Sequence, residues 1–74
     1  MSERLAAAAR LYEEVAAELE RAAAHAAVAA QHLRDENAPR ASAHAWALRG
    51  HLLEAEARLD EQAREHARRS EPQA

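Results

Sequence analysis

Alanine constrains this chain more than any other residue, because it supplies 23 of the 74 positions. It has the highest intrinsic helix propensity, and its small side chain lets two helices approach closely. The large apolar side chains are few: eight Leu, two Val, Met1, Tyr12 and Trp46. With one Gly, two Pro and almost no β-branched residues besides, the sequence predicts an all-α fold with a thin hydrophobic core.

The signals for helix ends predict a single domain, an antiparallel two-helix hairpin. Ser2 is a suitable N-cap, and Glu3 suits the positive end of the helix dipole. Asn37 tolerates the left-handed C-cap conformation, and Pro39 can open a second helix. We therefore expect a first helix over 3–36, a turn over 37–39, a second helix over 40–69 and a frayed tail over 70–74.

Each predicted helix carries an apolar seam with heptad spacing. In the first helix the larger positions are Leu5, Tyr12, Leu19, Ala26 and Leu33, and the companion positions are Ala9, Ala16, Ala23 and Ala30. In the second helix the seam is Ala45, Leu48, Leu52, Ala55, Leu59, Gln62 and His66. Spacings of three and four sustained over four heptads indicate a coiled-coil-like contact.

A further apolar stripe on the second helix predicts a partner. It consists of Ala43, Trp46, Gly50, Leu53 and Ala57, on a face turned away from the seam. So short a chain needs support beyond its core, and without Cys it has no disulfide or thiolate zinc site. We expect a homodimer forming a four-helix bundle, with Trp46 as anchor and Gly50 allowing close approach; a different partner protein would satisfy the same requirement.

Histidines form the one suggestive polar pattern. His25 and His32 are seven residues apart, as are His44 and His51, and the two pairs lie at matching levels if the chain folds back about Ala38. Glu36, four residues after His32, and Glu54, three after His51, could complete a site for a transition metal such as zinc or iron. The heptad pattern favours the alternative, in which hydrogen-bonded or solvated histidines line the seam's edge and no cofactor is bound.

The remaining charged residues give no support for enzyme chemistry. A cluster of acidic residues with two arginines nearby is typical of a solvated helix face: Glu13, Glu14, Glu18, Glu20, Arg10 and Arg21. His66 suits the negative end of the second helix dipole. A single glycine rules out a glycine-rich phosphate loop, and no serine has a nucleophile-elbow context.

Charge and hydropathy limit the kinds of partner that the chain is expected to bind. A net charge of −3 with arginines interspersed among acids argues against nucleic acid, and no apolar run reaches the roughly 20 residues of a membrane span. Without an N-terminal signal the chain is expected in the cytoplasm. Its alanine-rich heptads resemble Rop-type hairpins, a resemblance that implies dimerisation and an RNA-binding bundle face.

Three functions follow from these patterns, in order of preference. The first is a small non-enzymatic oligomerisation or protein-interaction module that scaffolds or regulates. The second is a metal-binding helical bundle for storage, sensing or redox work. The third is a Rop-like or antitoxin-like regulator associated with nucleic acid.

Overall fold

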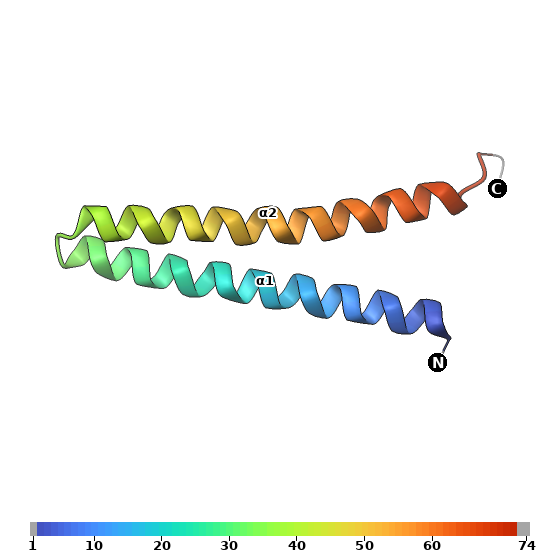
Figure 1. Ribbon diagram of the computed structural model, residues 1–74, viewed down its shortest axis with the longest axis horizontal. Coiled ribbons are helices and arrows are strands. Elements are labelled where there is room, and N and C mark those ends of the chain that lie inside the picture. The colour runs from blue at the N-terminus through green and yellow to red at the C-terminus, as the bar shows by residue number, and fades with distance from the viewer. Residues whose placement is uncertain (1, 73–74) are drawn as a thin grey trace.

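The computed structural model describes residues 2–72 and contains two helices, α1 (Glu3–Arg34) and α2 (Ala38–Arg69), that pack antiparallel (Figure 1). The predicted all-α hairpin is therefore confirmed, and no strand occurs between residues 2 and 72. Assembly of the hairpin into a four-helix bundle stays a prediction. Neither described helix is long and apolar enough to cross a membrane.

Side chains cap the outer ends of both helices. The Ser2 hydroxyl accepts a hydrogen bond from the Leu5 backbone N–H at 3.1 Å, which satisfies one of the unpaired donors of the first turn. At the other end α2 stops at Arg69, as predicted, and the Ser70 hydroxyl donates to the His66 carbonyl at 2.8 Å. Residues 73 and 74 of the predicted tail lie outside the described residues.

The turn differs from the prediction by two residues on each side. The N–H of Glu36 bonds to the carbonyl of Leu33 and the N–H of Asn37 to that of His32, which is a Schellman motif. Glu36, with φ of 60°, holds the left-handed position expected for Asn37. Asn37 instead caps α2, because its side-chain oxygen accepts from the Arg40 backbone N–H at 3.2 Å. The turn therefore ends one helix and starts the next within three residues.

The hairpin is held by two facing heptad rows, which we call the inner seam. On α1 the inner seam consists of Ala8, Leu11, Val15, Glu18, Ala22, His25, Ala29 and His32. On α2 it consists of Ala41, His44, Leu48, His51, Ala55, Arg58, Gln62 and Glu65. Every one of these sixteen residues is buried or half-buried, so the contact follows regular coiled-coil spacing.

The seam predicted for α1 was wrong. Leu5, Tyr12, Leu19 and Leu33 are between 46% and 59% exposed, and they lie one position beyond the inner seam. On α2 the prediction was partly right, since Leu48, Leu52 and Ala55 are buried or half-buried whereas Leu59 is exposed. The physical reason is that α1 carries two heptad rows, and the hairpin uses the row whose polar members find partners on α2.

The core is as thin as the composition predicts. Among the described residues the buried apolar side chains are Val15, Ala22, Ala41 and Ala55. No described large side chain is fully enclosed. Because apolar burial is the main stabilising contribution to a fold, a lone hairpin of this composition gains little from it.

Glu36→Gly should stabilise the hairpin by about 1 kcal/mol, because glycine adopts a left-handed backbone without the steric cost of a Cβ. Urea unfolding followed by circular dichroism measures this. Asp35→Gly is the matched control, since Asp35 has φ of −87° and gains no such relief. Equal midpoints for Glu36→Gly and the parent chain would contradict the assignment of strain to this residue.

Candidate functional site

The four histidines named by the sequence come together between the helices. The Nδ1 atoms of His25 and His44 lie 2.9 Å apart and share a hydrogen bond, so one ring donates and the other accepts. His25 stacks on His51 with ring centroids 5.4 Å apart, and His32 stacks on His44 at the same distance. These rings form a continuous ladder within the inner seam, and the expectation that they line its edge was wrong.

The two carboxylates proposed to complete a metal site lie elsewhere. Glu36 falls beyond the end of α1, so the four-residue helical spacing from His32 does not apply. Glu54 pairs with Arg58 at 3.1 Å. Within residues 2–72 no three His, Asp or Glu side chains are arranged to hold one metal ion.

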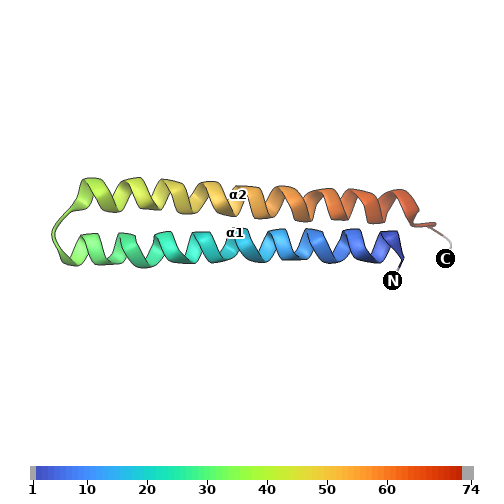
Figure 2. The same ribbon diagram turned by 60° about the horizontal axis from the view of Figure 1, so that its bottom comes forward.

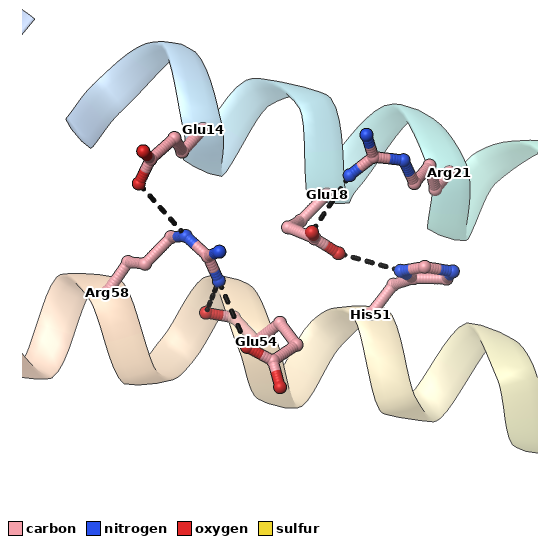
Figure 3. A network of polar contacts seen from close by, with 6 residues as sticks. All are labelled: Glu14, Glu18, Arg21, His51, Glu54 and Arg58. Atoms are coloured by element: carbon pink, nitrogen blue, oxygen red, sulfur yellow. Dashed lines mark hydrogen bonds and ion pairs between the residues drawn. The ribbon is translucent and has the colours of Figure 1, made fainter. Parts of the chain in front are cut away.

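Glu18 takes the place next to the ladder. Its side chain is buried and accepts hydrogen bonds from His51 Nδ1 at 2.7 Å and from Arg21 Nη1 at 2.8 Å (Figure 3). The hydrogen bond from His51 lowers the pKa of Glu18, burial works in the opposite direction, and the charge of Arg21 lowers it further. An ionised Glu18 fixes the His51 tautomer, since a carboxylate only accepts and Nδ1 must carry the hydrogen.

Sequence reasoning placed Glu18 on a solvated face and missed this contact, although the Arg21 partnership was expected. The signal was present: Glu18, His25 and His32 follow one another at seven-residue spacing. On α2 the same spacing joins His44, His51 and Arg58. Extending the histidine rows by one heptad in each helix would have put Glu18 and Arg58 in the seam.

Arg58 makes a second polar bridge between the helices. Its Nε donates to Glu14 at 3.2 Å, and its Nη1 donates to the side chain of Glu54 at 3.1 Å and to the Glu54 carbonyl at 3.0 Å (Figure 3). Hydrogen bonds to Glu54 and Glu14 raise the pKa of Arg58. Because both carboxylates are exposed, this bridge contributes little to stability and mainly fixes the relative position of the helices.

Two polar pairs of the inner seam, Glu18–His51 and His25–His44, are hydrogen-bonded across the helices. Among the described residues no buried side-chain nitrogen or oxygen lacks a hydrogen-bond partner. An unpaired polar group at these positions would cost free energy, so the pairs Glu18–His51 and His25–His44 are conditions for closing the hairpin.

The helices separate toward their free ends (Figure 1). Side chains of both helices line a groove there. Its volume is about 470 Å³, and Leu5, Tyr12, Gln62 and His66 line it, with Glu65 and Arg69 at its polar side. His66, which was assigned to the helix terminus, thus also faces this groove. The two views of the hairpin show that it is a single layer of two rods with both broad faces uncovered (Figure 2).

The predicted interface stripe of α2 is exposed in the hairpin. Trp46 is 75% exposed, Leu53 is 49% exposed, and Ala43, Gly50 and Ala57 are also exposed. A Cβ added at Gly50 would meet nothing within 4 Å, so no close approach inside the hairpin requires this glycine. The stripe remains a prediction for contact with a partner.

Glu18→Gln should lower stability near neutral pH, and the loss should shrink in acid. The pKa of Glu18 lies below its ordinary value of 4.5 in the fold, so its ionisation stabilises the hairpin above that value, and this contribution is lost as pH falls through the lowered folded value. Urea midpoints measured across this range test the dependence. Glu20→Gln, an exposed carboxylate on the same helix, is the control. If the urea midpoints of Glu18→Gln and the parent chain differ by the same amount at every pH, a role for the Glu18 charge is contradicted.

No protein-family model matches the chain, and the comparisons with curated proteins and with solved structures give no match either. What the hairpin does has therefore to be argued from its own geometry.

Proposed function

We propose that this hairpin is a non-enzymatic interaction module that works as a homo-oligomer, with a second copy covering its exposed apolar side chains. One observation carries the proposal: most of the described large apolar side chains are exposed in the hairpin. Eight of them are 41% to 75% exposed: Leu5, Tyr12, Leu19, Val28, Leu33, Trp46, Leu53 and Leu59. The buried apolar set, by contrast, is one valine and three alanines.

Magnitudes favour assembly over an isolated hairpin. Moving one exposed leucine fully out of water contributes roughly 1.5 to 3 kcal/mol, whereas an alanine contributes far less. Leu5, Tyr12, Leu19 and Leu33 keep roughly half of their surface exposed, so covering each of them would add about half of the contribution of a fully exposed side chain. Contiguous exposed apolar surface of this kind is typical of protein contact sites.

The oligomer predicts a mass of at least twice the 8.1 kDa of one chain at tens of micromolar, measured by sedimentation equilibrium. Because association favours only the folded chain, the unfolding temperature should also rise with protein concentration. A folded species of single-chain mass whose unfolding is independent of concentration would contradict the proposal.

Zinc binding is a second candidate function, supported by the contact between His25 and His44. In a tetrahedral zinc site the Zn–N distance of 2.0–2.1 Å puts two ligand nitrogens about 3.4 Å apart. The Nδ1 atoms, now 2.9 Å apart, would have to separate by a few tenths of an ångström to admit the ion. Two histidines of one chain would then hold the metal, with the remaining ligands supplied by water or by a second copy.

Calorimetric titration of the untagged chain with zinc chloride tests this candidate. A stoichiometric site at His25 and His44 should disappear in His25→Ala and persist in His66→Ala, because His66 lies outside the ladder. Zinc binding at both Nδ1 atoms requires the donor ring to carry its N–H on Nε2, because a neutral imidazole has one N–H that can lie on either nitrogen. Equal binding by both variants would show adventitious association.

A further inference from the structure

The exposed heptad row of α1 has the form of a second coiled-coil contact. We call this row the outer seam. It consists of Leu5, Ala9, Tyr12, Ala16, Leu19, Ala23, Ala26, Ala30 and Leu33. All nine residues are uncharged, all but the half-buried Ala30 are exposed, and the row extends about 42 Å at 1.5 Å per residue.

The direction of the outer seam suits a four-helix bundle. Successive residues of a helix turn by about 100°, so the centre of the outer seam lies roughly 100° around α1 from the centre of the inner seam. In a square four-helix bundle each helix contacts two neighbours at close to a right angle. α1 therefore has one seam for α2 and a second seam for one further helix.

We infer that the helix on the outer seam is α1 of a second copy, running antiparallel, with the two-fold axis close to Leu19. This inference rests on the proposed function and specifies its contact. The three leucines of the row are spaced evenly, with Leu5 and Leu33 each fourteen positions from Leu19, whereas the position that mirrors Tyr12 is Ala26. A two-fold contact requires a self-complementary surface: if one residue of the first copy contacts a second residue of the other copy, the same contact also occurs with the two copies exchanged.

Side-chain size decides the antiparallel direction. Antiparallel pairing sets three of the four large residues of one copy opposite an Ala of the other, and the fourth, Leu33 or Leu5 according to the register, lies level with Ser2 or Asn37 beyond the row. Leu19, for example, would face Ala16 or Ala23 of the second copy. Parallel pairing would set Leu19 against Leu19 and Ala16 against Ala16, giving layers that are alternately overfilled and empty. Alternation of large and small residues across a contact gives the denser packing.

The rival surface, the α2 stripe around Trp46, is shorter. Continuing its spacing beyond Ala57 brings in Asp60 and Arg64, so it spans about four turns and ends in charged residues. Trp46 lies on the side of α2 directed away from both α1 and the outer seam. The contact through the outer seam therefore leaves the indole in water, whereas a contact through the α2 stripe would bury it.

Cross-linking of single-cysteine variants tests the geometry, since the natural chain has no cysteine. With a short bis-maleimide, Leu19→Cys should link to itself, whereas Leu5→Cys and Leu33→Cys should not link alone but should link when mixed. Self-linking of Leu5→Cys would show a parallel dimer and overturn the inference. Linking of Leu53→Cys together with failure of Leu19→Cys would overturn it in favour of the α2 stripe.

Two measurements separate this inference from the proposed function. Leu19→Glu should weaken self-association by about 100-fold or more, because it places a charge in an apolar contact, and Ala24→Glu on the opposite flank of α1 should not. The emission of Trp46, the one tryptophan, should remain that of a solvated indole in the dimer. A blue-shifted emission on dimerisation would overturn the inference and leave the proposed function standing, whereas a parent chain of monomeric mass would overturn both.

Discussion

The hydrogen bond between Glu18 and His51 shows what kind of contact holds this hairpin together. A buried carboxylate and a half-buried imidazole sit where a conventional coiled coil has leucine, and His25 and His44 repeat the arrangement one heptad away. Such pairs roughly offset the cost of taking polar groups out of water, so they add little net stability. These pairs do, however, disfavour every other alignment of the two helices, because a misaligned polar side chain would lose its hydrogen-bond partner. The inner seam therefore specifies alignment more than it supplies free energy.

The two seams of α1 consequently differ in their physical role. Alanines of the inner seam let the helices approach closely enough for Glu18 and the histidines to meet their partners. The outer seam holds most of the large apolar side chains of α1, and these remain 46% to 59% exposed in the hairpin. A chain of this composition cannot place its leucines at both contacts. With the leucines in the outer seam, the hairpin is aligned but only weakly stabilised by its own core. Association with another chain is then the step that buries most apolar surface.

The sequence predicted the two helices correctly but not which face of α1 packs against α2. Propensity, the Ser2 cap and the breaks near Pro39 are local signals, so the two helices were predicted to within two residues at every end. Which face of α1 meets α2 is a non-local question. Heptad counting assigned Leu5, Tyr12 and Leu19 to the contact because they are large, although the neighbouring row fits the spacing equally well. Only the partners of Glu18 and His25 on the other helix distinguish the two rows.

The candidate site was predicted in the same uneven way. The seven-residue spacing and the matching levels of the histidines identified the ladder, because both depend on helix geometry alone. The carboxylates were predicted from their spacing along one helix. In the structure Glu36 lies beyond the end of α1 and Glu54 pairs with Arg58, so neither joins the histidines. Glu18 was overlooked because acidic residues among arginines are usually solvated. In an alanine-rich seam, however, the side chains opposite are too short to exclude a long polar one, and a buried Glu is accommodated as soon as a histidine comes within reach of its carboxylate.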